Sequence, residues 1–456
     1  MTDDSLIRRS VRQARRFEAR DLPAALAAKA ALCLVDALRC QLEGEALPMS
    51  LAARQIISTT GEVPVFGTDI LSSPADAAFA MAVAAAALLR EDMHPASIGH
   101  HGIIVWPTLL ALSGISTKSG ADLLAAGVVG YEFGGRLGAA LFDADLASRL
   151  RPSAFSATAG AAMAGAHFLG LDEDATVAAV ALAVDASSGL NQWARTGGDE
   201  VFIQAGRAAQ TAVRSLLLAQ AGAVGSATLL EGESGLFAAC GRRPPLDLGL
   251  FTAEPVISAV YNKALPICNF AQTSTQAAIA VARAPGFDHR RVSRIKVAVT
   301  EAARGYPGCD FTGPYDRPLQ AQMSIQFGVA AALARGGVRR DDFEALSDAD
   351  VIRLVGVCDL EADPAFTAAF PARQGARVEA TLDDGRTVSE TRDALTPATE
   401  EEMFAGLRRD GERVLGAAPT RRLLDLIATL PDLPDARELL RAASIQSLTR
   451  QPQRTT

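Results

Sequence analysis

The sequence predicts a mainly α-helical protein in which a large all-helical domain carries a smaller inserted α+β domain. Two observations favour this fold class. Stretches rich in alanine, leucine and glycine carry apolar residues at helical spacing from about residue 20 to 245, and helical spacing returns after Pro397. Between them lie alternating, valine-rich segments typical of strands. We therefore expect residues 1–258 and 396–456 to form the helical domain and residues 259–395 the α+β domain.

The first long helix is expected at residues 24–42. Leu26, Ala30, Cys33 and Ala37 share one face of it, and polar residues lie on the other face. Many of the later helical segments contain mostly small residues, so we expect several helices to approach closely and to be buried on nearly all sides. These further helices are expected at residues 77–89, 105–113, 120–142, 158–169, 174–186 and 206–221.

The α+β segment begins near residue 255. Residues 292–303 alternate and are rich in valine, which predicts a strand. Residues 376–393 predict two strands joined by a turn at Asp384-Gly385, because Asp-Gly favours hairpin turns. Residues 321–337, between these strands, return to helical spacing.

Two helices are expected after Pro397, at residues 399–415 and 420–430. Thr399 is a suitable N-cap because acidic residues fill the turn that follows it. The natural packing is for these C-terminal helices to rejoin the first domain. A cleft between the two domains is then the default place for a ligand site.

The composition excludes several classes of protein. The chain has 456 residues, 49% of them hydrophobic and 21% charged, as in a well-packed globular protein. Its net charge of −8 argues against a nucleic-acid partner. The six cysteines form no C-x-x-C pair, and the charged N-terminus has no apolar core of a secretory signal, so we expect a reduced, cytoplasmic setting. The apolar stretch 77–89 is too short for a membrane span.

The stretch "REDMHPASIGHHG" holds three of the five histidines of the chain, His94, His100 and His101, beside Glu91 and Asp92. Imidazoles titrate near neutral pH, so such a cluster is typical of a loop that transfers protons. The alternative interpretations are histidines with purely structural roles, and a metal site formed by Asp92, His94 and His100. We expect proton transfer and no metal.

Several fragments in order resemble the MmgE/PrpD family, which contains 2-methylcitrate dehydratase, cis-aconitate decarboxylase and iminodisuccinate epimerase. They cover residues 91 to 386 and are "EDMHPASIGHHGIIVWPTLLAL", "SGADLLAAGVVGYEFGGRLGAAL", "AFSATAGAAMAGAHFLGLD", "IQAGRAAQTAVRSLLLAQAG", "LEGESGLFA", "KALPICNFAQTSTQAAIAVA", "YDRPLQAQMSIQFGVAAAL" and "TLDDGR". The resemblance implies a helical domain built from both ends of the chain, an α+β lid, a site between them, a homodimer, and no metal or organic cofactor.

The resemblance also implies site residues. His100 matches the histidine of the family's His-Pro-Ser segment by its spacing from Pro107, and Asp92 and His94 match the acidic residue and histidine before it. Lys263 matches the lysine of the Lys-x-x-Pro segment. We expect His100 to act as acid or base, Lys263 as base or carboxylate clamp, and Asp92 to orient a histidine. Tyr315 in "YDRP" is the counterpart of a tyrosine that contacts the substrate in the decarboxylases.

The chain departs from the family at four ionisable positions. Ala154 and Val201 stand where many members have a histidine and a lysine, and Gln204 and Gln272 stand where they have histidines. We keep Gln204 and Gln272 as candidate substrate-binding residues.

Two residues could replace the ionisable groups that are missing. His101, in place of the family's proline, and Arg195, in the loop "NQWARTGGDE", are expected to supply the missing polarity and charge. Arg207 is expected to lie on a helix surface.

The chemistry that the resemblance implies is abstraction of a proton next to a carboxylate. We expect a dehydratase-type lyase that acts on a small di- or tricarboxylate-like acid. Decarboxylation and epimerisation through the same kind of intermediate are the alternatives. A third alternative is a dimeric ligand-binding protein without catalytic activity, because several ionisable groups are missing.

Overall fold

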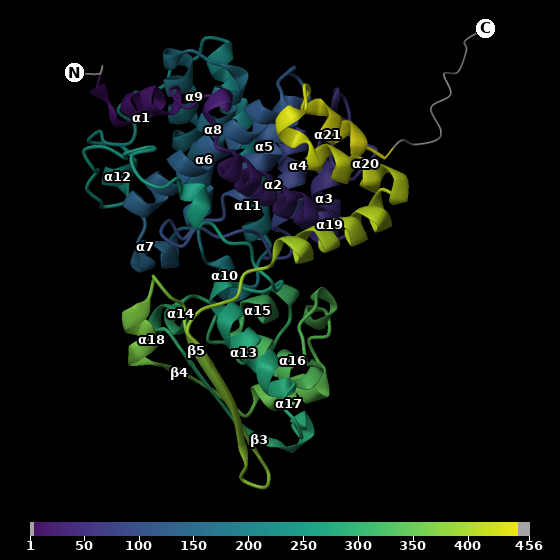
Figure 1. The fold of residues 1–456 in the computed structure, drawn as a ribbon. Helices are drawn as coiled ribbons and strands as arrows, with labels where there is room; N and C mark the ends of the chain where they lie inside the picture. Colours follow the sequence, from purple (N-terminus) through teal and green to yellow (C-terminus); the bar gives the residue numbers. More distant parts are fainter. Residues whose placement is uncertain (1–3, 446–456) are drawn as a thin grey trace.

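The computed structural model describes residues 4–445, so both ends of the predicted helical domain, residues 1–3 and 446–456, lie outside it. The chain forms a helical lobe and an α+β lobe (Figure 1). The helical lobe was expected to be all-helical, but it also contains a short antiparallel pair of strands, β1 (Val63–Pro64) and β2 (Leu71–Ser72). Helices hold 57% of the residues and strands 8%, which confirms the mainly α fold class. The principal helices of the upper lobe are α1 (Leu6–Ala14), α2 (Ala24–Gly44), α3 (Pro48–Ile56), α4 (Pro74–Ala86), α5 (Gly102–Ser113), α6 (Gly120–Leu141), α7 (Ala144–Arg149), α8 (Pro152–Leu169), α9 (Glu173–Asp185), α10 (Trp193–Thr196), α11 (Glu200–Gln220) and α12 (Leu236–Ala239).

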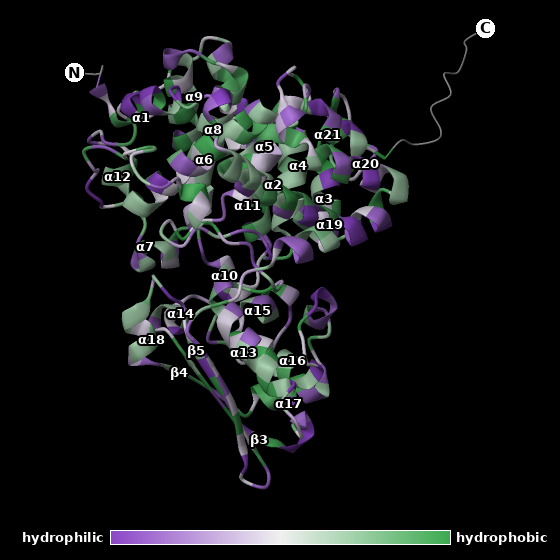
Figure 2. Ribbon diagram, viewed as in Figure 1, coloured by the Kyte–Doolittle hydropathy of each residue, from purple (hydrophilic) through white to green (hydrophobic). Residues whose placement is uncertain are grey.

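The centre of the helical lobe is apolar on nearly all sides, as the small-residue composition predicts. Every residue of α5 is buried, and α4, α6 and α8 are buried along most of their length. Hydropathy follows this arrangement, with hydrophobic helices at the centre and hydrophilic residues on outer helices such as α19 and α20 (Figure 2). One expectation was wrong: the polar face expected for residues 24–42 is partly buried, because Asp36 and Arg39 on that face of α2 are both buried and form an ion pair at 2.6 Å.

The lower lobe contains a four-stranded sheet with strand order β4-β3-β5-β6. The strands are β3 (Val292–Val299), β4 (Cys358–Ala362), β5 (Ala376–Leu382) and β6 (Thr387–Arg392). β3 pairs parallel with β4 and antiparallel with β5, and β5 and β6 form the predicted hairpin. Gly385 in its turn has φ +81°, a conformation that favours glycine. The predicted strand at 292–303 is shorter, because Thr300 caps a helix that starts at Glu301.

Helices α13 (Gln272–Ala282), α16 (Ile325–Arg335) and α17 (Ala349–Val355) pack against this sheet. The remaining helices of the lobe are α14 (Glu301–Gly305), α15 (Pro318–Met323) and α18 (Pro364–Ala369). The helix expected at 321–337 is interrupted, since Ser324 ends α15 and its hydroxyl caps α16 by accepting from Phe327 N.

The chain returns to the upper lobe through α19 (Glu400–Val414), α20 (Ala417–Ala428) and α21 (Arg437–Ala442). α19 packs on α2, so the two ends of the chain share one lobe. Thr399 is its N-cap, as predicted. We propose the borders 258/259 and 395/396 for the two domains. Within residues 4–445 no helix combines the length and apolarity needed to cross a membrane.

Candidate active site

A narrow pocket lies where the lobes meet. It has about 550 Å³ of unfilled space, its mouth included. The upper lobe contributes residues from the histidine loop and from the start of α8, and the lower lobe contributes the segments around residues 268 and 306. The lining residues are Leu89, Glu91, Met93, Ile98, His100, Arg151, Pro152, Ser153, Trp193, Lys263, Cys268, Asn269, Phe270, Tyr306 and Met323.

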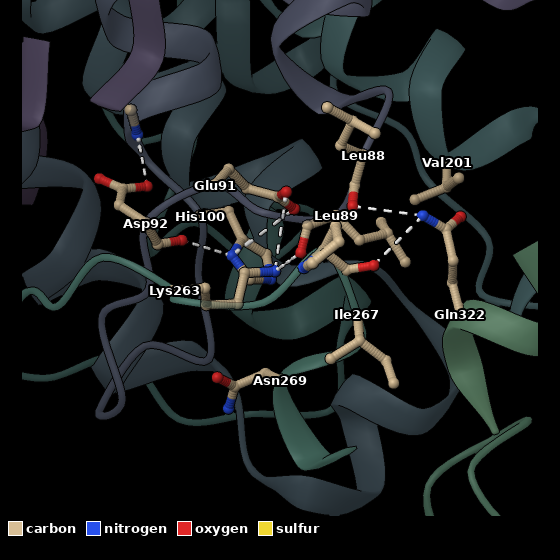
Figure 3. Close-up of polar contacts among 12 residues, drawn as sticks. Leu88, Leu89, Glu91, Asp92, His100, Val201, Lys263, Ile267, Asn269 and Gln322 are labelled. Atoms are coloured by element: carbon tan, nitrogen blue, oxygen red, sulfur yellow. Dashed lines mark hydrogen bonds and ion pairs between the residues drawn. The ribbon is translucent and has the colours of Figure 1, made fainter. Parts of the chain in front are cut away.

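His100 is held at the wall of this pocket by its backbone and its ring. Its backbone N–H donates to the Ser153 hydroxyl at 2.9 Å, in the first turn of α8. Its Nδ1 lies 2.5 Å from the carbonyl oxygen of Asp92 (Figure 3). A carbonyl only accepts, so Nδ1 carries the proton and Nε2 has the free lone pair. Burial and the charges of Lys263 and Arg151 hold the pKa of His100 well below its usual value.

Lys263 and Glu91 form a buried ion pair beside His100. The Lys263 ammonium lies 3.6 Å from the Glu91 carboxylate, and both side chains are 1% exposed. The ammonium also donates to the carbonyl of Leu89 (Figure 3). Neither carboxylate oxygen of Glu91 has a hydrogen-bond partner in the described chain, and one of them is 3.8 Å from His100 Nδ1. This carboxylate therefore lines the pocket with its hydrogen-bonding capacity unused.

Two residues of the pocket wall adopt an unusual backbone conformation. Leu89 and Ile98 have φ +51° and +50°, in the left-handed region that non-glycine residues rarely occupy. Leu89 presents its carbonyl to Lys263, and Ile98 lies just before the paired histidines. Strained backbone of this kind clusters at functional sites, where the surrounding structure holds it in place.

A second cation, Arg151, lines the pocket. It is 5% exposed, donates from one terminal nitrogen to the carbonyl of Val201 at 3.0 Å, and lies over the Trp193 ring at 5.4 Å. By formal charge the pocket lining holds two cations, Lys263 and Arg151, and one carboxylate, Glu91, so beside a neutral His100 it carries one net positive charge. It is therefore suited to a small anion.

Asp92, His94 and His101 lie behind the pocket wall. The Asp92 carboxylate accepts hydrogen bonds from the Tyr131 hydroxyl and from Gly102 N at the start of α5. Burial raises its pKa to about 7. Ser97 Oγ bridges His94 Nδ1 at 2.8 Å and His101 Nε2 at 3.0 Å. These side chains brace the loop that carries His100.

Four further residues predicted to bind substrate lie outside the pocket lining, as His101 does. Arg195 is exposed on α10, and Gln204 donates to the carbonyl of Leu190. Gln272 is fully buried and holds the loop around Leu265 through its amide. Tyr315 donates to the carbonyl of Phe311 and packs on Phe327.

Sequence reasoning missed Glu91 and Arg151 as pocket residues. Glu91 stood next to the predicted Asp92, and its acidic side chain between an apolar run and the histidines was a usable signal. Arg151 gave no such signal, because an arginine before a proline at a helix start is ordinary at a surface. Its burial is visible only once α8, α10 and α11 are placed.

Cys268 lines the pocket, with its sulfur 3.7 Å from that of Cys309, whose hydrogen bond lowers the pKa of Cys268. Across residues 4–445 no group of three or more histidine, cysteine, aspartate or glutamate side chains is arranged to hold a metal ion. The absence of metal and cofactor from the reaction remains a prediction.

The fold and this pocket define a two-lobed, mainly helical protein with a positively charged junction site that contains a neutral histidine. Residues 11–248 match the MmgE/PrpD N-terminal domain, and residues 265–430 match the MmgE/PrpD C-terminal domain. The chain belongs to the MmgE/PrpD family, as its motifs predicted.

Curated relatives match most of the chain. A cis-aconitate decarboxylase-like protein of Aspergillus oryzae is 28% identical over 92% of this chain and 93% of its own length. The cis-aconitate decarboxylase of Aspergillus terreus is 25% identical over 92% of each chain. The human cis-aconitate decarboxylase is 27% identical over 80% of this chain and 79% of its own.

Proposed function

We propose that the protein is a cofactor-independent lyase that removes a proton next to a carboxylate of a small di- or tricarboxylic acid, with loss of water as the outcome. The observation that carries this proposal is the state of His100. Its Nδ1 proton is donated to a backbone carbonyl, which leaves Nε2 unprotonated in a pocket of net positive charge. A neutral imidazole is a base, and a positive pocket attracts the carboxylate substrate.

In the proposed mechanism His100 Nε2 accepts the proton from the carbon next to a substrate carboxylate. The electron pair of the broken C–H bond moves into that carboxylate, and Lys263 stabilises the added negative charge. The C–O bond on the neighbouring carbon then breaks. The leaving hydroxide takes the proton back from His100, so the products are water and an alkene.

Substrate binding also strengthens this base. The positive charges of Lys263 and Arg151 contribute to the low pKa of His100. A bound carboxylate offsets those charges, so the pKa of His100 rises toward neutrality in the complex. Asp92, His94 and His101 are positioning residues in this proposal, because they hold the loop and do not line the pocket. Arg195, Gln204, Gln272 and Tyr315 make no substrate contact in it.

Decarboxylation is the second candidate, and the names of the relatives favour it. Both matches that span 92% of the chain are to proteins named cis-aconitate decarboxylase or decarboxylase-like. In that reaction a C–C bond breaks, carbon dioxide leaves, and the carbanion takes a proton. The neutral His100 has no proton on Nε2 to give, so Lys263 would be the donor. This difference in the required protonation state is why dehydration is proposed first.

The test is to incubate the protein in deuterated water with a panel of hydroxy and unsaturated di- and tricarboxylic acids, followed by ¹³C NMR. An alkene formed without carbon dioxide supports dehydration, and release of carbon dioxide supports decarboxylation instead. Recovered substrate that carries deuterium at one stereocentre supports an epimerase.

His100→Ala is the decisive variant. His289→Ala is its control, because His289 lies in the α+β lobe near Asp350 and outside the pocket. The proposal predicts at least a hundredfold lower turnover for His100→Ala, on the order expected for loss of a general base, and wild-type turnover for the control. If His100→Ala turns over every substrate at the wild-type rate, the enzymatic role of His100 is wrong. Acid binding without any turnover would favour the ligand-binding alternative.

The homodimer and the cytoplasmic setting remain part of this proposal. Light scattering on the purified chain is expected to give twice the mass of one protomer.

A further inference from the structure

Arg151 is a buried cation without a carboxylate partner. Its residue exposure is 5%, and no carboxylate oxygen of residues 4–445 lies within 4.0 Å of its guanidinium. A guanidinium has five N–H donors, and the described chain provides one acceptor for them, the carbonyl of Val201 at 3.0 Å. Arg151 is one of the lining residues of the pocket, so a ligand bound there is the available source of acceptors for the remaining donors.

A buried charge that lacks a counter-ion is unfavourable, so its presence calls for an explanation. Glu91 does not supply the missing partner, since its carboxylate lies closer to Lys263, at 3.6 Å. Two cations therefore share one protein carboxylate in this pocket. An anionic ligand would restore the balance at Arg151, and the fork of a guanidinium matches a carboxylate through two parallel hydrogen bonds.

The surroundings of Arg151 hold its side chain in place. It is the N-cap residue of α8, an 18-residue helix whose positive end faces the same pocket through Pro152 and Ser153. The Trp193 ring lies under the guanidinium at 5.4 Å. The side chain is thus fixed before a ligand arrives, which lowers the entropic penalty of binding.

The contact with Val201 adds a second argument. Val201 is in the first turn of α11, and the Arg151 guanidinium donates to its backbone carbonyl, so the side chain is held between the starts of α8 and α11. Lys263 approaches the pocket from a segment that connects the lobes, so the two cations come from separate elements.

We propose that Arg151 binds a second substrate carboxylate, distinct from the one stabilised by Lys263, and thereby selects acids with at least two carboxylates. This inference rests on the proposed function, because it takes the bound acid to be the substrate. Binding of a carboxylate at Arg151 does not itself depend on turnover.

The experiment is isothermal titration of the protein with tricarballylate, succinate and acetate. These acids contain no hydroxyl group or carbon–carbon double bond, so the proposed elimination cannot consume them. The variants are Arg151→Gln, which keeps a donor for the Val201 carbonyl, and Arg151→Lys, which keeps the charge but loses the fork. Arg207→Gln, an exposed arginine on α11 outside the pocket, is the matched control. Circular dichroism checks that each variant is folded.

Arg151→Gln is expected to weaken tricarballylate and succinate binding by at least about tenfold, the range for loss of a charged hydrogen-bonding group. Its preference for succinate over acetate falls by a similar factor. Arg151→Lys gives a smaller loss, and it carries the test if the glutamine variant does not fold. Arg207→Gln binds all three acids as the wild type does.

Three outcomes separate this inference from the proposed function. Wild-type affinity for succinate and tricarballylate in both Arg151 variants overturns the inference, even if the protein is a lyase. Failure of the wild type to bind any polycarboxylate also overturns it. Loss of polycarboxylate binding in Arg151→Gln supports the inference, even if the wild type turns over none of the acids in the panel.

Discussion

At the scale of single residues, the Lys263–Glu91 pair links stability to chemistry. Both side chains are almost completely buried, and removal of one partner leaves the other charge uncompensated. We predict that Lys263→Met lowers the free energy of unfolding by roughly 3–5 kcal/mol, the range for a broken buried ion pair. It should also lower turnover at least a hundredfold, as loss of an electrostatic stabiliser does. Urea unfolding and steady-state kinetics measure the two effects.

The double variant Lys263→Met with Glu91→Gln provides the control. It removes both charges, so most of the lost stability returns while turnover stays low. Full stability in the single variant would show that the pair is not energetically coupled.

Asp92 should make stability depend on pH in a direction opposite to that of an ordinary carboxylate. Burial raises its pKa from 3.8 to about 7. Between these values the unfolded chain releases the proton and the folded chain keeps it, so stability falls as pH rises through this window, by at most about 1.4 kcal/mol per pH unit. Asp92→Asn removes this loss.

The measurement is urea unfolding of the wild type and Asp92→Asn at pH 4.5, 5.5 and 7.5. The variant is expected to gain stability relative to the wild type as pH rises. A difference between the two proteins that is constant across the three pH values would contradict a raised pKa for Asp92.

The candidate site could be predicted from the sequence only in part. Some of its residues stand in a recognisable motif, and others do not. His100 and Lys263 were identified because clustering and family motifs point to them, and both line the pocket. Arg151 becomes a pocket residue through burial at the lobe junction, which local sequence does not encode, whereas the place of Glu91 beside the histidines was a signal in the local sequence. Tyr315 matched a motif, but its hydroxyl bonds to a neighbouring carbonyl outside the pocket lining.

At the scale of elements, the contact between α6 and α8 depends on glycine. A Cβ added at Gly160 would lie 2.5 Å from the carbonyl oxygen of Gly130, and backbone cannot move away as a flexible side chain can. On the same helix as Gly130, Gly134 lies close to the His101 ring, so a shift of α6 reaches the histidine loop. The expectation of closely packed small-residue helices is confirmed here.

We predict that Gly160→Ala destabilises the protein by about 1–3 kcal/mol, the usual range for overpacking of a core. Gly337→Ala is the matched control, because a Cβ there meets no atom within 4 Å. Urea unfolding measures both. Equal stability of the two variants would mean that the helices can separate without loss.

The predicted helix boundaries were correct where the sequence shows a clear N-cap and wrong where the N-cap was not recognisable. Thr399 and its capping box begin α19 as predicted, and α2 and α6 begin at the expected residues. Ser324 was not recognised as a cap, so one helix was expected where α15 and α16 are present. A serine inside an apolar run does not reveal whether its hydroxyl faces the backbone of the next turn.

At the scale of the whole molecule, the chain passes between the two lobes twice, and the first passage, residues 259–263, contacts two other stretches of the chain. Tyr261 pairs with Met93 through backbone hydrogen bonds of 2.8 and 3.0 Å, and Asn262 accepts from Ala398 N at 2.9 Å. This segment thus contacts the histidine loop and the returning chain just before Lys263. The insertion was predictable from the change in sequence texture, whereas this meeting of three distant stretches required the structure.

The whole molecule should lose stability in mild acid because its histidines are buried as neutral groups. Burial lowers the pKa of His94 and His167 to about 4, and it holds the pKa of His100 and His101 well below the usual value. Each ring takes up a proton on unfolding, so its contribution to stability is complete above pH 6.5 and is lost as pH falls toward the folded pKa. Four such groups outweigh the single opposing group, Asp92.

The free energy of unfolding is therefore expected to fall as pH drops from 6.5 to 4.5, by at most about 1.4 kcal/mol per pH unit for each histidine. Two variants change this slope in opposite directions. His167→Gln, at the end of α8 and outside the pocket, removes one proton uptake and makes the slope shallower. Asp92→Asn removes the opposing group and makes it steeper. Identical slopes in wild type and His167→Gln would show that His167 is already protonated in the folded protein at these pH values.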